Sequence, residues 1–260
     1  MKIKILVMGT LVLISSVSHM SSFSNKRTPL PIYAQEGAPS FAVAELFTAE
    51  GCSTCPQADK FTSELYRAYH AQNQPVYVLA FHVDYWDEYG WTDNFGRAEF
   101  SKRQRKYGSL FKLESVYTPQ LIINGAEEMV GSDPNARTSI DAALQKPASV
   151  IVNIEPVFDA DKKKITVHYT LSRVPANCVL NIAIVERGLV REIWRGENSG
   201  RTLTHDNVVR SFKTVKKPSA DGYSTVELPA DIHTDNSSIV AFLQDSDSLR
   251  ILGAAGADLK

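Results

Sequence analysis

Hydrophobic side chains in the first half of the chain follow two alternating patterns. Residues 41–48 and 75–83 are almost continuously apolar, which predicts two buried strands. Residues 56–71 instead place hydrophobic side chains at helical spacing, and a second helix is expected over residues 97–107. The first half therefore begins with a strand, a helix and a second strand.

A hairpin and a third helix are expected next. Asn124-Gly125 lies between two short apolar runs, and this dipeptide is a strong signal for a two-residue hairpin turn. Asp133-Pro134 follows, where the aspartate can cap a helix and the proline can occupy its first turn. That helix is expected to end near Gln145.

After residue 147 only short strand-like runs remain, separated by turn-forming clusters. Strands are expected over residues 150–158, 164–173, 179–187, 208–215, 223–228 and 238–244. Many short strands at fairly even spacing predict an antiparallel β-sandwich. The expected fold class is an α/β domain over residues 40–147, followed by an all-β sandwich domain over residues 148–260.

The first twenty residues have the pattern of an export signal. Lys2 and Lys4 precede an apolar run over residues 5–17, shorter than the roughly 20 residues that a membrane-spanning helix needs. We expect residues 1–18 to be a signal peptide, or an uncleaved anchor as the sole membrane attachment, and residues 19–39 to be a flexible linker. The protein is therefore expected to be periplasmic or secreted.

Composition narrows the function classes. The 28 basic and 29 acidic residues give a net charge of −1, which argues against nucleic acid as a partner. With 43% hydrophobic and 22% charged residues, the chain has the composition of an ordinary folded protein. Three cysteines are too few for a disulfide scaffold.

The sharpest chemical motif is the sequence GCSTCP at residues 51–56, at the junction of a predicted strand and helix. There Cys52 lies at a helix N-terminus, where free backbone N–H groups and the helix dipole favour its thiolate. Cys55 follows one turn later, within reach of a mixed disulfide on Cys52. The motif predicts thiol-disulfide exchange without a cofactor, on a protein or small-molecule thiol or disulfide.

A structural interpretation of the cysteine pair stays open, whereas a zinc site is not expected. A stable Cys52–Cys55 disulfide can brace the groove of a non-catalytic binding protein. A zinc site would need a second pair of ligands at comparable spacing, which Cys178 alone does not supply, so no metal site is predicted.

The segment Val116-Tyr117-Thr118-Pro119 precedes the expected hairpin, and together with the cysteine motif it resembles the thioredoxin fold. The resemblance implies that Pro119 follows a cis peptide bond and faces the cysteine pair across a substrate groove. It also implies that Thr118 offers backbone atoms to an extended substrate. A trans proline at a strand start is the alternative.

A closer resemblance covers most of residues 41–147. It is carried by the blocks VAELFTAEGCSTCPQADK, LAFHVDYWDEYGWTDNF, RQRKYG and VYTPQLIING…VGSD. These blocks resemble the secreted thioredoxin-like family catalogued as domain of unknown function 1223. The later block SGRTLTHDNVVRSF resembles a segment of related exported two-domain proteins.

The wider thioredoxin resemblance implies roles for individual residues. Cys52 is then the attacking thiol, Cys55 the resolving thiol and Pro119 the groove proline. Thioredoxins also carry a buried acid on the strand before the cysteines, and the nearest candidate is Glu45, one residue further from the pair. Glu50 is nearer, but a carboxylate beside the thiol raises its pKa and opposes activation.

A dense aromatic and ionisable segment follows the second strand. Its members are His82, Asp84, Tyr85, Trp86, Asp87, Tyr89 and Trp91. The segment either roofs the active site, with His82 or Asp84 tuning the thiols and Trp86 contacting substrate, or packs over the sheet edge. A third interpretation is a copper carrier that uses both cysteines and His82, although such carriers have a longer cysteine spacing.

Three further features have plain expected roles. His205 either faces the active-site groove or, more commonly for a loop histidine, is solvated. Cys178 lies in an apolar stretch and is expected to be a buried, inert thiol. The basic residues of one helix are expected to form a solvated face, and they are Arg97, Lys102, Arg103, Arg105 and Lys106. The substrate, the redox partner and the direction of the reaction stay open.

Overall fold

The elements of the chain are given by a computed structural model, which describes residues 37–159 and 163–259. The first half forms β1 (Ala42–Thr48), α1 (Cys55–His70), β2 (Val76–His82), η1 (Asp87–Tyr89), α2 (Ala98–Leu110), β3 (Gln120–Ile123), β4 (Glu127–Val130) and α3 (Asn135–Leu144). The second half forms β5 (Val152–Asp159), β6 (Lys164–Leu171), β7 (Cys178–Glu186), β8 (Leu189–Glu192), β9 (Thr202–His205), β10 (Val208–Lys216), β11 (Asp221–Glu227), η2 (Thr234–Asn236), β12 (Ser237–Asp245) and β13 (Ile251–Asp258). The expected signal peptide and most of the expected linker lie outside the described residues.

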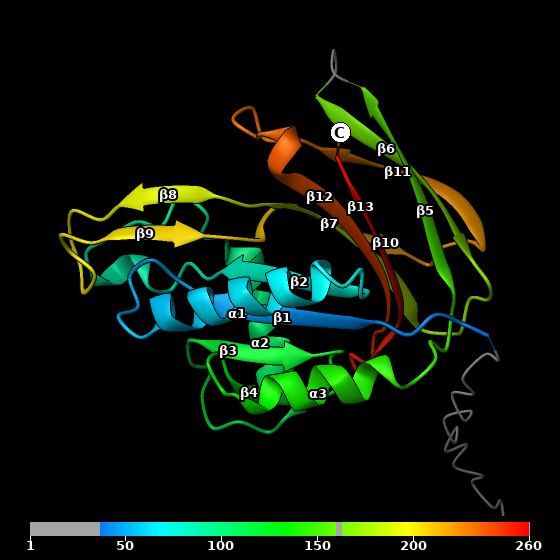
Figure 1. Cartoon of the computed structure of the whole chain (residues 1–260), viewed down its shortest axis with the longest axis horizontal. Coiled ribbons are helices and arrows are strands. Elements are labelled where there is room, and N and C mark those ends of the chain that lie inside the picture. Colours follow the sequence, from blue (N-terminus) through cyan, green and yellow to red (C-terminus); the bar gives the residue numbers. More distant parts are fainter. Residues whose placement is uncertain (1–36, 160–162, 260) are drawn as a thin grey trace, which may run out of the picture. The chain divides into compact units, whose positions relative to one another are not determined.

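The largest sheet is mixed and has the strand order β13-β12-β7-β10-β2-β1-β3-β4 (Figure 1). Within it β1 is parallel to β2 and antiparallel to β3, and β4 is antiparallel to β3. Two further antiparallel sheets have the orders β11-β6-β5 and β8-β9. The fold is therefore mixed α/β, with one large mixed sheet and additional antiparallel sheets.

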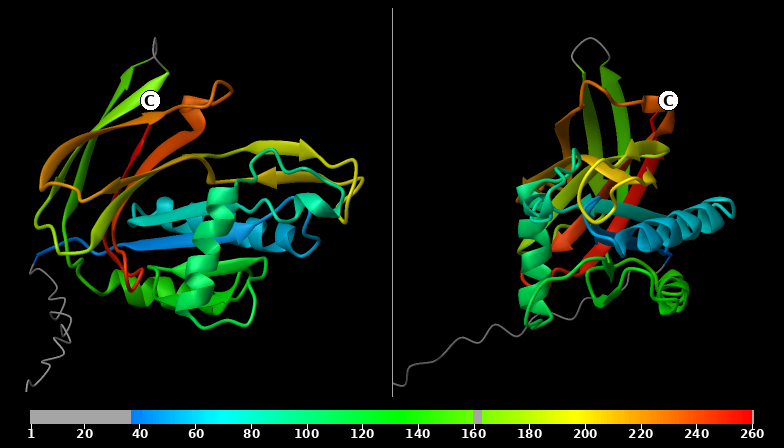
Figure 2. Two further views of the ribbon diagram at one scale, coloured as in Figure 1. Left: turned by 180° about the vertical axis from the view of Figure 1, so that it is seen from behind. Right: turned by 90° about the vertical axis from the view of Figure 1, so that its left-hand side faces the viewer.

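Helices cover both faces of β1, because successive side chains of a strand point to opposite faces. Ala44 and Leu46 pack into a core cluster with residues of α1 and α3. Phe47 packs on the other face against Phe100 and Tyr107 of α2. Figure 2 shows α2 on one side of the sheet, with α1 and α3 on the other. Burial on both faces explains why β1 is apolar almost throughout.

The Asn124-Gly125 hairpin is confirmed. Both residues have positive φ angles, 48° and 64°, as a two-residue type I′ turn requires. A Cβ on Gly125 would lie 1.9 Å from the carbonyl oxygen of Leu249, so only glycine fits there. The third helix begins one residue later than predicted, with Pro134 rather than Asp133 as its N-cap, although the Asp133 carboxylate still accepts the Asn135 N–H at 2.8 Å.

All six strands expected after residue 147 are present, as β5, β6, β7, β10, β11 and β12. These strands do not form a sandwich that is separate from the first half of the chain. β10 pairs in parallel with β2 through Val208 and Ala80, and β7, β12 and β13 extend the same sheet. The sheet of β5, β6 and β11 packs over β12 and β13 through a second core cluster. The boundary at residue 147 stays a prediction.

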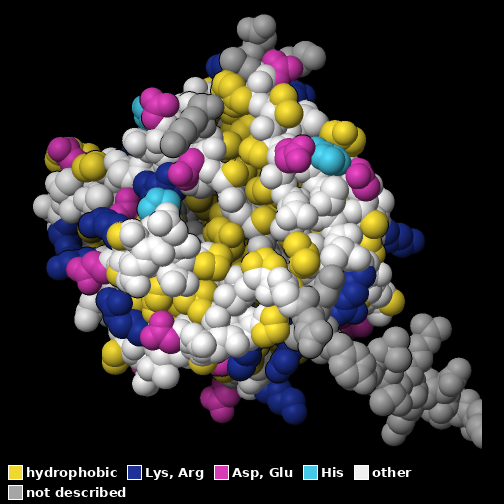
Figure 3. Space-filling model, turned by 45° about the vertical axis from the view of Figure 1, so that its right-hand side comes forward, with side chains coloured by type: hydrophobic (Ala, Val, Ile, Leu, Met, Phe, Trp, Pro, Cys, Tyr) yellow, Lys and Arg dark blue, Asp and Glu magenta, His cyan; other side chains and the backbone are white. Residues whose placement is uncertain are grey.

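Two further observations concern the helices and the surface of the described part of the chain. No helix among residues 37–159 and 163–259 is long and apolar enough to cross a membrane. Basic and acidic side chains are intermixed on the face shown in Figure 3, as expected for a net charge of −1.

Candidate functional site

The cysteine motif lies where β1 turns into α1. Cys55 is the first residue of α1, Pro56 follows in the first turn, and the Cys55 N–H is bonded to the Cys52 carbonyl at 3.2 Å. Cys52 and Cys55 form a disulfide with their Cα atoms 5.4 Å apart. Only 1% of Cys52 and none of Cys55 is exposed. The pair therefore has the predicted position in the chain but is buried.

The Thr118–Pro119 peptide bond is cis, as predicted, so the trans alternative is wrong. Pro119 is buried beside the cysteine helix. A Cβ on Gly131 would meet the Cβ of Pro119 at 2.7 Å and that of Ala58 at 2.8 Å. Ala58 is one turn beyond Cys55 on α1. Pro119 and α1 therefore both pack against Gly131.

Trp86 connects the cysteine loop to the residue before the proline. Its indole N–H donates to the Thr118 hydroxyl at 2.7 Å, and a Cβ on Gly51 would lie 3.3 Å from the Cβ of Trp86. Trp86 and Tyr85 also pack against the core cluster that contains both cysteines. Asp84 instead hydrogen-bonds Ser101 of α2, through both its backbone N–H and its carboxylate. Of this segment, Trp86 rather than Asp84 lies beside the pair.

His82 is buried and bound to a carboxylate. Its Nδ1 lies 2.7 Å from Asp93 Oδ2, which also accepts the backbone N–H of Glu50 at 2.8 Å. Burial alone would raise the pKa of Asp93, but the charge and hydrogen bond of His82, with the backbone bonds, lower it to about 2. His82 thus supports the cysteine loop through Asp93 and Glu50. Roles for His82 in tuning the thiols or in binding copper stay predictions.

A buried charged cluster made of Glu50, Asp59 and His205 lies beside the pair; we call it the His205 cluster. His205 Nε2 lies 3.4 Å from Glu50 Oε1, and His205 Nδ1 lies 3.5 Å from Asp59 Oδ2. Burial would lower the pKa of His205, but Asp59 and Glu50 outweigh it and raise the pKa to about 10. His205 is therefore protonated at neutral pH.

Two neutral donors and one further cation, Arg191, complete the His205 cluster. Thr48 donates its hydroxyl to Asp59 at 2.8 Å, Trp91 donates its indole N–H to Glu50 at 2.7 Å, and Arg191 approaches Glu50 at 3.3 Å. The interpretation of His205 as a solvated loop histidine is wrong, because β9 carries it onto α1 and leaves 2% of it exposed.

The β8–β9 hairpin covers the cysteine loop, and Figure 1 shows it extending along α1 toward the start of that helix. Asn198, in the loop between the two strands, has no exposed surface and donates to the carbonyl oxygens of Glu50 at 2.8 Å and Cys52 at 2.9 Å. The Glu197 carboxylate accepts the Ser53 N–H at 3.1 Å. This hairpin and the core cluster against which Trp86 packs together bury Cys52. Neither strand is predicted from hydrophobic patterning, and the block SGRTLTHDNVVRSF is the one signal that pointed to this segment.

Replacing Asn198 by alanine is expected to lower the free energy of unfolding by about 1–3 kcal/mol, because two buried carbonyl groups lose their donor. It should also speed reduction of the Cys52–Cys55 disulfide by dithiothreitol. Urea unfolding and timed alkylation measure the two effects. Asn153→Ala is the control, since Asn153 makes its side-chain bond to Thr170 at the surface. Equal effects of both variants would contradict the prediction.

Glu45 points to the α2 face and is held by Arg103. The two side chains make a bidentate pair at 2.5 and 2.9 Å, and the Tyr107 hydroxyl donates to Glu45 at 2.6 Å. The expectation that Arg103 belongs to a solvated face is wrong, because it lies among the rings of Phe81, Tyr107, Phe212 and Phe242. A role for Glu45 as proton acceptor of Cys55 stays a prediction.

Cys178 is a free, buried thiol, as expected, and burial raises its pKa to about 11. Within the described part of the chain, no group of three or more histidine, cysteine or acidic side chains is arranged to hold a metal ion.

Comparisons with known proteins identify a family and several similar solved structures, two of which are described below. A family model described as "Protein of unknown function (DUF1223)" matches residues 43–244. The crystal structure of protein AGR_C_4864 from Agrobacterium tumefaciens is similar, with a TM-score of 0.62 and 26% identity over 87% of this chain and 97% of that one. A domain of the outer membrane lipoprotein Omp28 from Porphyromonas gingivalis has a TM-score of 0.26 and 16% identity over 43% of this chain and 95% of that one, too low to support an argument. No curated protein matches.

Proposed function

The chain belongs to the DUF1223 family, and we propose that it is an exported thiol-disulfide oxidoreductase. The observation that carries the proposal is the position of the cysteine pair, at a strand-to-helix junction beside a cis-proline. Separate elements supply the two features, since the cysteines precede and begin α1 and Pro119 precedes β3. Trp86 joins them through Thr118.

The strand arrangement supports a thioredoxin-like assignment for the first half. Four neighbouring strands have the order β2-β1-β3-β4, with β1 and β2 parallel and β3 antiparallel to β1. Helix α1 connects β1 to β2, and α3 follows β4. In the proposed assignment the second half is a sandwich whose larger sheet continues that of the first half.

The proposed reaction moves two electrons. With the pair reduced, the Cys52 thiolate attacks one sulfur of a substrate disulfide, a Cys52–substrate disulfide forms, and the other substrate sulfur leaves as a thiolate that takes up a proton. Cys55, after losing its proton, attacks Cys52 Sγ and releases the second substrate sulfur. The substrate is then reduced and the Cys52–Cys55 disulfide is restored. The same steps in reverse oxidise a dithiol substrate.

Export is part of the proposal and rests on the sequence pattern of residues 1–18.

A second candidate is a binding protein in which the disulfide is a structural brace. The burial of Cys52, at 1% exposure, and its cover by Asn198 favour this candidate, because an exchange catalyst must present its attacking sulfur to substrate. The two candidates differ in how easily the disulfide is reduced.

The deciding experiment is the reduction potential of the Cys52–Cys55 pair in purified protein, equilibrated with thiol-disulfide buffers and trapped by alkylation. A value of about −120 to −270 mV supports the oxidoreductase, and a value below about −300 mV supports the brace. Buried Cys178 is the internal control for alkylation of the folded state. In the first case Cys52→Ser should abolish turnover of a disulfide-bonded test protein, whereas Cys178→Ser should keep it.

A further inference from the structure

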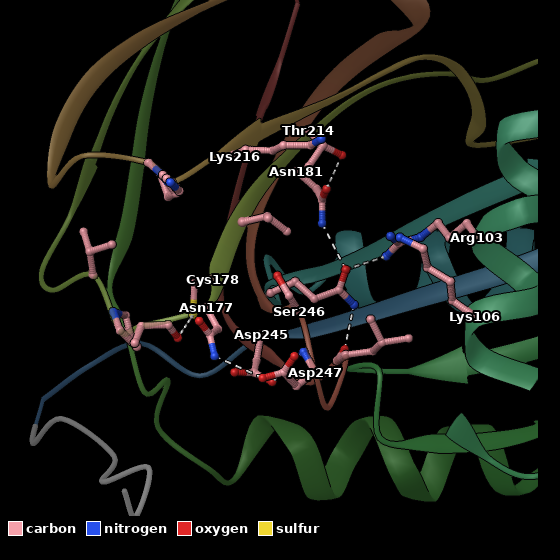
Figure 4. Close-up of a pocket in the computed structure, with 18 of the residues that line it drawn as sticks. Arg103, Lys106, Asn177, Cys178, Asn181, Thr214, Lys216, Asp245, Ser246 and Asp247 are labelled. Carbon is pink, nitrogen blue, oxygen red and sulfur yellow. Dashed lines mark hydrogen bonds between the residues drawn. The ribbon is translucent and has the colours of Figure 1, made fainter. Parts of the chain in front are cut away.

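A hollow of about 780 Å³ lies between α2 and the strands β7, β10 and β12 (Figure 4). Its volume is within the range of small-molecule binding sites. Cys52, Cys55, Pro119, Thr118 and Trp86 do not line it; the cysteine in its wall is the free Cys178. The hollow is therefore separate from the proposed redox site, and its role does not depend on that function.

The floor of the hollow is polar and held in place by hydrogen bonds (Figure 4). Thr214 donates to Asn181 at 2.8 Å, and Asn181 donates to Gln244 at 3.0 Å. Gln244 also accepts from Arg103 at 3.0 Å and donates to the Leu249 carbonyl at 2.6 Å. Because Asn181 and Gln244 are buried, this network fixes the shape of the floor without a ligand.

Arg103 lies at the edge of this floor, and some of its N–H donors have no acceptor. Its Nε and Nη2 atoms bind Glu45 and Gln244, and 14% of the side chain is exposed. Its Nη1 atom has no hydrogen-bond partner among the described residues. A guanidinium that is already fixed by Glu45 loses little freedom when it binds a further oxygen acceptor.

Three lysine side chains around the hollow have no acidic partner, against two aspartates without a basic one among the described residues. Lys106, Lys216 and Lys217 line it, and none of the three has an ion-pair or hydrogen-bond partner in the part of the chain that the structure describes. Lys106 is on α2 and Lys216 on β10, so cations approach the hollow from two elements.

The two acidic side chains that line the hollow keep their charge but are bonded to neutral donors of the protein. Asp245 accepts the backbone N–H and the hydroxyl of Ser248, both at 2.7 Å. Asp247 accepts the Asn177 amide at 3.1 Å. Apolar groups complete the wall, namely Val174, Pro175, Ala176, Pro218 and Leu249.

We propose that this hollow binds a small organic polycarboxylate, whose carboxylates are bound by Lys106, Lys216 and Arg103 Nη1. The volume and the apolar wall favour a ligand with a carbon skeleton over an inorganic anion. The spare lysines and the planar arginine donors favour carboxylate groups over neutral ones. Binding should weaken as salt is added, because the lysines are exposed.

Isothermal titration of the purified protein at low salt tests the proposal, with citrate and succinate as probes. Succinamide is the neutral counterpart and inorganic phosphate the inorganic one. We expect at least one carboxylate to bind with 1:1 stoichiometry, succinamide to show no binding and phosphate to bind at least tenfold more weakly. Absence of binding by both carboxylates, or equal binding of phosphate or succinamide, would overturn the proposal.

Paired variants locate the site. Lys106→Ala/Lys216→Ala should weaken carboxylate binding tenfold or more. Lys102→Ala/Lys163→Ala removes the same charge from residues that do not line the hollow and should change the affinity by less than twofold. Similar weakening by both pairs would mean general attraction by surface charge and would rule out the hollow as the site. Urea unfolding of each variant checks that the fold is intact.

Discussion

Glu45→Ala should lower the free energy of unfolding by about 3–5 kcal/mol, the usual effect of removing one partner of a buried ion pair. Arg103 would keep its charge among four aromatic rings and lose both of its carboxylate contacts. The pairing with Glu45 holds the pKa of Arg103 above its ordinary value, although burial alone would lower it. In the variant only burial remains and lowers this pKa, but an arginine guanidinium does not lose its proton in proteins, so the buried charge stays.

Urea unfolding followed by circular dichroism measures this effect. The matched control is Glu64→Ala, since Glu64 pairs with Lys60 at 4.0 Å on the exposed face of α1. That change should cost no more than about 1 kcal/mol. The double variant Glu45→Leu/Arg103→Met leaves no buried charge, so it should lose less stability than the sum of the single changes at these two positions. A loss below about 1 kcal/mol for Glu45→Ala would show that the pair is not important for stability.

The free energy of unfolding should decrease as pH rises from about 6.5, with His205 as the main cause below pH 9. The folded-state pKa of His205 is about 10, against an ordinary value of 6.5, so the folded state holds a proton that the unfolded chain releases. This stabilisation is fully present below pH 6.5 and is lost as pH rises through 10. Cys178, whose ordinary pKa is 9.0, and the tyrosines titrate at higher pH.

The variant His205→Gln measures how much of this pH dependence of the free energy of unfolding comes from His205. The variant should be less stable than the wild type at pH 6, by about 3–5 kcal/mol, because buried Asp59 loses its cation and Glu50 keeps Arg191 alone. The difference should shrink as pH rises toward 10. Urea unfolding at pH 6, 7.5 and 9 gives the comparison, and His70→Gln, at an exposed histidine on α1, is the control. Parallel pH profiles for wild type and His205→Gln would contradict the assignment.

Local sequence patterns predicted the parts of the molecule that are determined locally. The hairpin turn needs positive φ at two adjacent residues, and Asn124-Gly125 supplies them. The position of the cysteines follows from the end of an apolar strand and the start of a helical pattern. The cis bond before Pro119 came from resemblance, since no property of the isolated sequence Thr-Pro specifies it.

The missed elements depend on contacts between distant residues. β13 has the sequence ILGAAGAD, whose glycines and alanines are poor strand formers in isolation. Its Gly253 is required by packing, because a Cβ there would lie 1.9 Å from the Val150 carbonyl oxygen. The Glu45–Arg103 pair likewise joins residues 58 positions apart. The His205 cluster joins residues more than 140 positions apart, and neither contact has a local sequence signal.

The pairing of β10 with β2 determines where this protein can be divided. In the intact chain Asn207 O accepts the Ala80 N–H at 2.8 Å, and Val208 pairs with Ala80. A fragment that ends at residue 147 has no β10, so β2 becomes the edge of the sheet with apolar residues on both faces. The same fragment lacks His205 and leaves Glu50 and Asp59 without their cation. The second half thus protects the first from edge-to-edge aggregation, and recombination between relatives should preserve the two halves as one unit.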